Sequence, residues 1–188
     1  QGYGMTECAP VISTSLSWNI KKESVGQLIP NCEAKVVDSE IWVRGSSVML
    51  GYYKMPDETA ETLEDGWLKT GDLGYVDQEG FVFLTGRKKN LIITKNGENV
   101  SPEELENKLG ENRIVQEVLV REKDGVIEAE IFPDYEYIKK KEISDIQGTL
   151  QQLIDEYNQK AVAYKKIYRL TVREKKKKKT PSKKIKRY

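Results

Sequence analysis

The stretch from Gly66 to Glu106 constrains the fold of this chain more than any other part of its sequence. It contains a Thr-Gly-Asp turn at Thr70–Asp72, a hairpin that turns at Gly80, the sequence Gly-Arg-Lys-Lys at 86–89, an apolar strand, and a glycine loop that opens a helix. Glycine lets a backbone approach a ligand closely, so two of these turns are typical of binding sites. These two turns, at Thr70–Asp72 and at Gly86-Arg87, flank the hairpin, and a charged pivot, Lys88-Lys89, follows the second turn. The stretch therefore predicts a ligand site at a domain boundary.

Length and charge limit the classes of protein that fit. The chain has 188 residues, enough for one large domain or two small ones, and its formal net charge is +1. That balance gives no indication of a nucleic-acid partner, although Lys and Arg are concentrated near the C-terminal end. Cys8 and Cys32 lack the CxxC spacing of a metal or redox site, so we interpret them as free thiols of a reducing cytoplasm.

Targeting signals are not evident in the sequence. No apolar run approaches the ~20 residues of a membrane span, and the first residues have neither the basic nor the apolar region of a signal peptide. We therefore expect a cytoplasmic location. The chain also begins without Met, which indicates a fragment of a longer protein.

The first part of the chain predicts a small, β-rich, barrel-like lobe. Residues 1–32 are rich in Gly, Ser, Thr and Pro, and we expect a loop with one short strand there. Apolar alternation and turn residues predict three later features: two strands within 33–50 joined at Asp38-Ser39, a short helix from Pro56 to about Leu63, and a hairpin that pairs 73–77 with 81–85.

The second part predicts a compact α+β lobe. Ser101 followed by Pro102 and two glutamates is a helix start, with Ser as N-cap and Pro at the first helical position. Other patterns predict strands at 90–95, 114–121, 125–132 and 167–172, and an amphipathic helix over 143–160. The predicted fold class is thus α+β, with one domain over 1–87 and another over 88–188.

The sequence Gly-Tyr-Gly-Met-Thr-Glu near the start is the first candidate site. Gly2 and Gly4 allow the backbone to approach a ligand. Tyr3 could stack on a base, and Thr6 could donate to a phosphate. Glu7 could bind Mg²⁺. An ordinary glycine turn without a ligand remains the alternative.

Three charged residues are further candidates. The Asp72 carboxylate could accept from two adjacent ribose hydroxyls, and Arg87 could bind ribose or phosphate oxygens. Lys184 could neutralise charge at a phosphoryl centre. Their alternatives are a capped turn, a surface salt bridge and a solvated lysine, respectively. The chain contains no His, which excludes imidazole-based catalysis but not attack by an already ionised carboxylate substrate.

The order of these motifs resembles that of the adenylate-forming superfamily. That group contains acyl-CoA synthetases, luciferase and the adenylation domains of peptide synthetases. The order is GYGMTE, then GWLKTGD, then GRKK, then KNGENVSPEELE, and finally a C-terminal Lys-Ile-x-Arg. The resemblance covers essentially the whole chain and is strongest to bacterial long-chain fatty acid–CoA ligases, notably over Gly86–Glu106.

The resemblance implies a nucleotide site at the N-terminal motifs. Tyr3 would stack on adenine, Thr6 would contact phosphate, and Glu7 would bind Mg²⁺. Asp72 would hold the ribose hydroxyls of ATP or AMP, assisted by Arg87.

The resemblance also implies a site in the C-terminal lobe. Lys89 would be the hinge between a large N-terminal domain and a mobile C-terminal one, whose rotation would exchange two faces at the active site. Lys184 would bridge the fatty acid carboxylate and the α-phosphate during adenylation. The Gly97 loop would line the tunnel for coenzyme A.

Two departures from the family pattern matter. The family has Gly before the catalytic lysine, whereas Lys183 stands there in this chain. The glycine-rich phosphate loop and the acyl pocket expected upstream of GYGMTE are missing. We therefore expect a C-terminal fragment that is inactive alone.

Two rival functions remain open at this point. One is an adenylation enzyme that loads an acyl carrier protein. The other is a non-catalytic binding module whose basic residues from Lys175 to Arg187 contact an anionic membrane surface or nucleic acid. No aromatic residue interleaves with the lysine run over 175–179, which argues against single-stranded nucleic acid.

Overall fold

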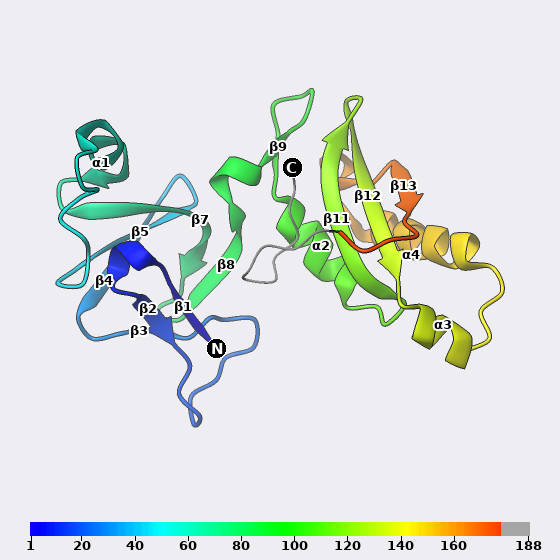
Figure 1. Ribbon diagram of the computed structural model, residues 1–188, viewed down its shortest axis with the longest axis horizontal. Coiled ribbons are helices and arrows are strands. Elements are labelled where there is room, and N and C mark those ends of the chain that lie inside the picture. The colour runs from blue at the N-terminus through cyan, green and yellow to red at the C-terminus, as the bar shows by residue number, and fades with distance from the viewer. Residues whose placement is uncertain (178–188) are drawn as a thin grey trace. The chain divides into compact units, whose positions relative to one another are not determined.

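A computed structural model describes residues 1–177 of the chain (Figure 1). It divides into two compact units, Gln1–Lys89 and Asn90–Tyr188, called unit 1 and unit 2 below. The division lies close to the domain boundary expected between residues 87 and 88. Each unit is described by itself.

Unit 1 begins with a three-stranded antiparallel sheet of β1 (Gly2–Gly4), β2 (Val11–Thr14) and β3 (Gln27–Leu28). The prediction of a loop with one strand was therefore wrong for this region. These strands are too short to produce a recognisable alternation of apolar residues. Gly4 is required where β1 and β2 meet, because a Cβ there would lie 1.8 Å from the carbonyl oxygen of Pro10.

The larger sheet of unit 1 has five strands in the order β4 (Cys32–Val37), β5 (Glu40–Gly45), β7 (Trp67–Val76) and β6 (Leu63–Glu64), with β8 (Val82–Arg87) paired to β7. Both predicted hairpins are confirmed. The first turns at Asp38 and Ser39, whose φ angles are +48° and +65°. Such positive values at both central residues match the right-handed twist of the flanking strands.

Two further elements complete unit 1. The helix predicted after residue 55 is present as α1 (Pro56–Thr62), and a 3₁₀ turn (Thr6–Cys8) follows β1. Cys8 and Cys32 are both buried and form no disulfide. Burial is the main reason that the pKa of the Cys8 thiol is raised to about 11. Both cysteines therefore act as small apolar side chains in the core.

Unit 2 is built on a three-stranded sheet of β11 (Val115–Lys123), β12 (Val126–Pro133) and β13 (Arg169–Val172), in which β13 runs parallel to β12. The helices α2 (Pro102–Gly110) and α4 (Ile146–Lys160) lie against one face of this sheet (Figure 1). The core formed there contains Leu105, Leu109, Val120, Ala129, Ile131, Leu150 and Ile154. A short pair, β9 (Ile92–Ile93) and β10 (Asn99–Val100), precedes α2.

The sequence did not predict the helix α3 (Tyr135–Lys140). It follows β12 directly, and the carboxylate of its N-cap residue Asp134 accepts from the backbone N–H groups of Glu136 and Tyr137. At six residues the helix is too short to show a period.

The predicted α+β class is confirmed for the described residues. The β-rich unit consists of open sheets rather than a closed barrel. No helix within residues 1–177 is long and apolar enough to cross a membrane.

Candidate functional site

Asp72 is the centre of the first candidate site. It lies on β7 directly opposite Arg87 on β8, and Arg87 Nε is 2.6 Å from Asp72 Oδ1. The Asp72 side chain is 6% exposed, whereas that of Arg87 is 39% exposed. The strand register thus brings together two of the predicted ribose-binding residues and ties the guanidinium to the carboxylate.

Tyr3 reaches the same carboxylate from the other sheet of unit 1. Its hydroxyl donates to Asp72 Oδ2 at 2.7 Å, although the two residues are 69 positions apart. Tyr3 is 9% exposed. Burial and then the neighbouring Asp72 charge raise the pKa of the Tyr3 phenol far above its ordinary range, so it remains a donor. Asp72 therefore accepts a hydroxyl group on one side and a cation on the other.

The Thr-Gly-Asp sequence was predicted to form a turn, but it lies within β7, where Gly71 has a φ of +69°. A residue that sequence reasoning missed holds it in place. Glu40 is 3% exposed, and its Oε1 accepts from the Gly71 N–H at 2.9 Å. Its Oε2 accepts from Lys88 Nζ at 2.9 Å. Burial alone would raise the pKa of Glu40, but Lys88 and the Gly71 N–H lower it overall. A carboxylate at the first position of a strand was the only signal available in the sequence.

Thr70 completes the support of this stretch of β7. Its hydroxyl donates to the Ile41 carbonyl at 2.6 Å and accepts from the Asp72 N–H at 3.1 Å. The three residues of the predicted ligand turn are therefore fixed by β5 on one side and by their own backbone on the other.

The N-terminal motif borders an open pocket of about 430 Å³, lined by Gly2 to Thr6 and by residues of β2. Thr6 is exposed there. Glu7 lies at the next position, and its Oε1 accepts from the Tyr52 hydroxyl at 2.9 Å. Burial, and after it Glu7, raises the pKa of Tyr52.

Among residues 1–177, no three His, Cys, Asp or Glu side chains lie close enough together to hold a metal ion. Mg²⁺ is commonly bound by one or two carboxylates together with substrate phosphates. A partly buried Glu7 beside an exposed Thr6 fits that pattern.

A second candidate site lies in unit 2 around Gly97. This residue has a φ of +81°, and nothing lies within 4 Å of where its Cβ would be. The loop is closed by the Gly97 N–H donating to Thr94 O at 2.9 Å and by the Glu98 N–H donating to Thr94 Oγ1 at 3.1 Å. Gly97 therefore stands at the open tip of a tight turn.

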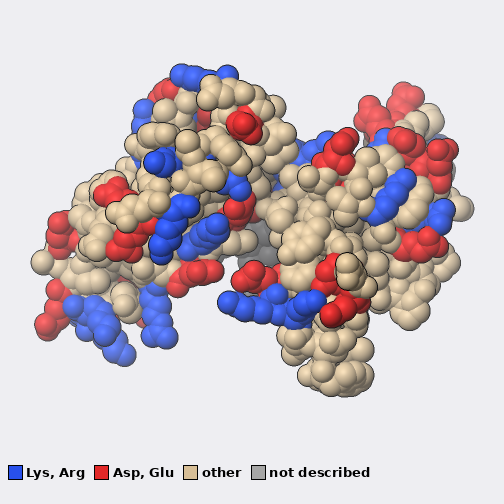
Figure 2. Space-filling model, turned by 180° about the vertical axis from the view of Figure 1, so that it is seen from behind, with Lys and Arg blue, Asp and Glu red and all other residues tan. Residues whose placement is uncertain are grey.

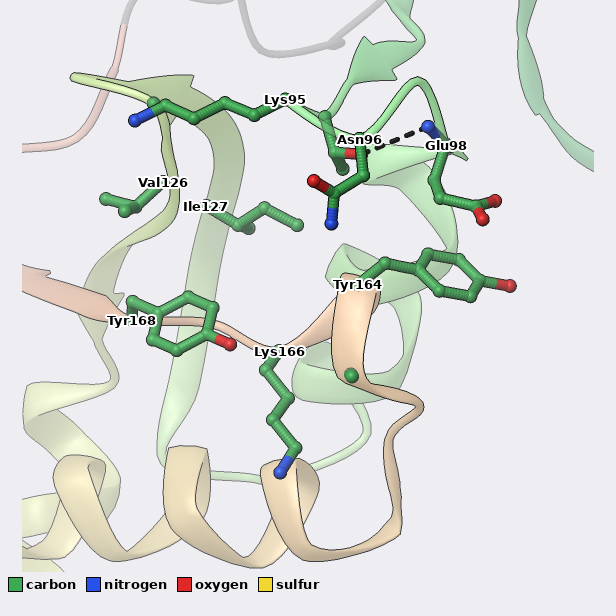
Figure 3. A pocket seen from close by; sticks show the side chains of 11 residues that line it. Lys95, Asn96, Glu98, Val126, Ile127, Tyr164, Lys166 and Tyr168 are labelled. Atoms are coloured by element: carbon green, nitrogen blue, oxygen red, sulfur yellow. Dashed lines mark hydrogen bonds between the residues drawn. The ribbon is translucent and has the colours of Figure 1, made fainter.

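A pocket of about 370 Å³ adjoins this turn (Figure 3). Lys95 and Lys166 extend from opposite sides of it, and Tyr168 lies near Ile127 between them. Tyr164 lines the pocket from the 3₁₀ turn Ala163–Lys165. The lining combines cations with aromatic rings, which suits a ligand with phosphates and a flat ring.

Lys89 and Lys184 are the two remaining residues predicted from the sequence. Lys89 is exposed and is the last residue of unit 1. Lys184 lies outside the described residues.

Comparison with known proteins identifies the family. Residues 1–53 match the model of the AMP-binding enzyme family, and residues 89–187 match that of the AMP-binding enzyme C-terminal domain. The chain belongs to this family of AMP-binding enzymes.

Its relatives narrow the similarity further. A long-chain-fatty-acid–CoA ligase of Escherichia coli O157:H7 is 42% identical over 130 residues, which cover 63% of this chain and 23% of the relative. The enzyme of the same name from Bacillus subtilis is 40% identical over 133 residues, covering 64% and 24%. The chain thus spans about a quarter of the length of these relatives.

Solved structures show the same architecture. An o-succinylbenzoate coenzyme A synthetase from Bacillus subtilis, in complex with its acyl-adenylate intermediate, superposes with a TM-score of 0.79 at 30% identity. The match covers 98% of this chain and 39% of the synthetase. The same synthetase in complex with ATP and a magnesium ion gives a TM-score of 0.77 at 31% identity.

Proposed function

We propose that the enzyme to which this chain belongs activates a long-chain fatty acid with ATP and Mg²⁺, forms acyl-AMP and pyrophosphate, and then transfers the acyl group to coenzyme A. The main support is the Asp72 carboxylate held between Tyr3 and Arg87. The names of the relatives support the choice of a long-chain fatty acid.

Asp72 is suited to bind the ribose of ATP. A ribose hydroxyl is the same kind of donor as the Tyr3 hydroxyl, which Asp72 already accepts at 2.7 Å. Arg87 lies opposite Asp72 in the strand register, and its guanidinium holds one oxygen of the carboxylate in place.

The phosphates of ATP would lie at the N-terminal motif. Thr6 would donate to a phosphate oxygen, and Glu7 would hold Mg²⁺ together with phosphate oxygens. The ion supplies neutralisation of the phosphate charge when it is bound. Tyr52 donates to Glu7 and so orients that carboxylate.

Coenzyme A is the acceptor that we favour over a carrier protein. The pocket beside the Gly97 turn offers Lys95 and Lys166 for phosphate groups and tyrosine rings for a base. Gly97 leaves space for the pantetheine arm, because no other atom lies near its missing Cβ. A carrier protein would present pantetheine without the adenine nucleotide and would leave this pocket unused.

Domain roles and location follow from this proposal. Unit 1 would belong to the large AMP-binding domain, unit 2 would be the mobile C-terminal domain, and Lys89 would be the hinge between them. We propose a cytoplasmic enzyme that contacts anionic membranes at most peripherally. On the face drawn in Figure 2, basic and acidic side chains are interspersed, which does not favour binding to nucleic acid.

The test of the proposed function is Lys184→Ala in the enzyme that contains this chain. A lysine ammonium between the α-phosphate and the attacking carboxylate reduces the repulsion between two anions. Removing one such donor typically lowers the rate by about 10²–10³. We expect this loss in pyrophosphate release, whereas synthetic acyl-AMP should still be converted to acyl-CoA.

The neighbouring lysines are matched controls. Lys183→Ala and Lys186→Ala remove the same charge and should change the rate little. If Lys183→Ala is as damaging as Lys184→Ala, the lysine that acts is displaced by one position. If Lys184→Ala releases pyrophosphate at the normal rate, the proposed function is wrong.

A further inference from the structure

The sheet of unit 2 has a second face that no helix of residues 1–177 covers, and three buried glutamates lie on it. Glu128 is 0% exposed, and Glu117 and Glu130 are each 6% exposed. Glu117 is on β11, and the other two are on β12. These three residues are called the acidic face below. Ionised carboxylates this deeply buried need cations or hydrogen-bond donors close by.

One of those cations comes from the sheet itself. Arg121 lies opposite Glu128 in the register, and its Nε is 3.2 Å from Glu128 Oε2. The same guanidinium forms an ion pair with Glu130 through Nη2. Thr171 on β13 donates its hydroxyl to Glu128 Oε1 at 2.8 Å. Side chains of β11 and β13 therefore contact Glu128 from both neighbouring strands.

Lys123 of β11 lies 3.9 Å from Glu128 Oε1, and further donors come from residues 173–177, called the tail segment below. The segment continues from β13 and crosses the sheet toward β11 (Figure 1). Lys177 Nζ lies 2.7 Å from Glu130 Oε2, and the Lys177 backbone N–H donates to Glu117 Oε2 at 3.2 Å. One residue thus binds two strands of the acidic face.

Other contacts fix the path of the tail segment. The Arg173 N–H donates to Ile131 O at 2.8 Å, and its Nη2 donates to Lys175 O at 2.6 Å. Lys176 Nζ lies 5.8 Å from the centre of the Phe132 ring. The segment is therefore held at its start, middle and end.

The lysines of this segment differ in their environment. The Lys177 side chain is 20% exposed, whereas Lys175, two positions earlier, is exposed. A solvated low-complexity run would show no such difference. Lys177 is thus distinguished from its neighbours by position rather than by residue type.

We propose that Glu117 and Glu130 are positioning residues that bind Lys177 and so fix the point from which the chain leads to Lys184. The proposal rests on the role of Lys184 in the proposed function. Lys184 follows Lys177 by seven positions and follows the last residue of β13, Val172, by twelve.

The expected effect is modest, because the Arg173 and Lys176 contacts still hold the tail segment when Lys177 is released. Losing an ion pair of this kind should lower the rate of adenylation about twofold, which lies within the range for partly exposed pairs. The KM for ATP should stay unchanged, because the substitution removes none of the groups proposed to bind the nucleotide.

The first experiment measures the contact itself by hydrogen exchange on the 188-residue chain. Lys177→Ala should accelerate exchange of the backbone amide at position 177 about tenfold, the effect of losing one hydrogen bond to a charged group. Lys177→Arg keeps the charge and should retain protection. Lys175→Ala is the matched control and should leave the amide at 177 unchanged.

The second experiment measures the two half-reactions in the enzyme that contains this chain. Lys177→Ala should lower kcat for pyrophosphate release about twofold, with KM for ATP and thioester formation from synthetic acyl-AMP unchanged. Lys177→Arg and Lys175→Ala should both behave like the unchanged enzyme. If Lys177→Ala equals Lys175→Ala in either experiment, the positioning role is wrong.

Lys184→Ala, measured in parallel, distinguishes failure of the positioning role from failure of the proposed function. An impaired Lys184→Ala enzyme with a normal Lys177→Ala enzyme overturns the positioning role alone. A fully active Lys184→Ala enzyme overturns both the proposed function and the positioning role.

Discussion

Both units bury carboxylates beneath cations, but they obtain the cations differently. In unit 1 the partner of Asp72 is Arg87, which the strand register places directly opposite. In unit 2 register supplies Arg121, but Glu130 also pairs with Lys177, which lies beyond the last strand. The first cluster is complete once its strands pair. The second is complete only when the tail segment folds back over the sheet.

This difference matches the tasks proposed for the two units. A site that binds a nucleotide benefits from a carboxylate whose position is set by the fold, since preorganised groups need no rearrangement on binding. The contact between Lys177 and Glu130 instead fixes the place where the chain leaves the sheet on the way to Lys184, the proposed catalytic lysine.

The largest effect should come from Asp72→Ala. This change leaves the Tyr3 hydroxyl and the Arg87 guanidinium without their shared acceptor in a buried place. Because Arg87 is partly exposed, we expect unit 1 to lose about 2–3 kcal/mol of stability rather than the full cost of a broken buried pair. Urea unfolding followed by tryptophan fluorescence measures this loss.

Fluorescence is specific here because Trp18, Trp42 and Trp67 all lie in unit 1. Asp57→Ala is the matched control, since Asp57 is exposed in the first turn of α1 and should cost less than about 1 kcal/mol. Equal losses for the two variants would show that Asp72 is not held as strongly as its contacts indicate.

A smaller effect is expected for Glu40→Ala. The variant loses the acceptor for the Gly71 N–H and the partner of Lys88, and we expect a loss of about 2 kcal/mol, again by tryptophan fluorescence. Glu40→Gln keeps an oxygen for Gly71 and should recover about half of it. If Gln is no better than Ala, the ion pair with Lys88, rather than the turn, accounts for the effect.

The sequence predicted the features that depend on local patterns. The hairpins of the larger sheet, the helix after Ser101 and the long helix of unit 2 were all visible as alternation, turn residues or 3.6-residue periodicity. Asp72 and Arg87 were both identified as ribose-binding candidates, and their pairing required only the hairpin between them.

Features that depend on distant parts of the chain could not be predicted. Tyr3 contacts Asp72 across 69 positions, and no local pattern indicates such a contact. Glu40, Glu128 and Glu130 are buried, although the alternation along their strands assigns them to the polar face. Their burial depends on cations from elsewhere in the chain, so the sequence alone gives no reason to single them out.

The pairing in unit 2 predicts a pH dependence that sharpens the comparison. Burial alone would raise the pKa of Glu130, but Lys177, Arg121 and Arg173 lower it overall from 4.5. A lowered pKa contributes stability that is present above the unfolded value and is lost as pH falls through the folded value. Lys177→Ala should therefore cost about 1 kcal/mol at pH 7 and nothing once Glu130 is protonated in the folded protein.

Circular dichroism at the helical band measures this change, because the longer helices α2 and α4 are in unit 2. Tryptophan fluorescence of the same samples should show no change in unit 1. A loss of stability that persists at low pH would mean that Lys177 acts through packing rather than through the charge of Glu130.

The smallest effect is expected where Lys35 lies over two tryptophan rings of the larger sheet in unit 1, because register again supplies the cation. Lys35 lies opposite Trp42 in the pairing of β4 with β5, and its Nζ is 4.8 Å from the Trp42 ring centre and 4.5 Å from that of Trp67. A cation between two rings at a partly exposed site contributes about 0.5–1 kcal/mol. Lys35→Met keeps the apolar part of the side chain and removes only the charge, so the expected loss is of that size in urea unfolding followed by fluorescence.

Lys22→Met is the control, because its side chain is 93% exposed and its removal should have no measurable effect. If both variants give the same result, a cation placed by strand register stabilises unit 1 only at the buried Asp72–Arg87 pair. If only Lys35→Met loses stability, a cation placed by register also stabilises unit 1 at the tryptophan rings.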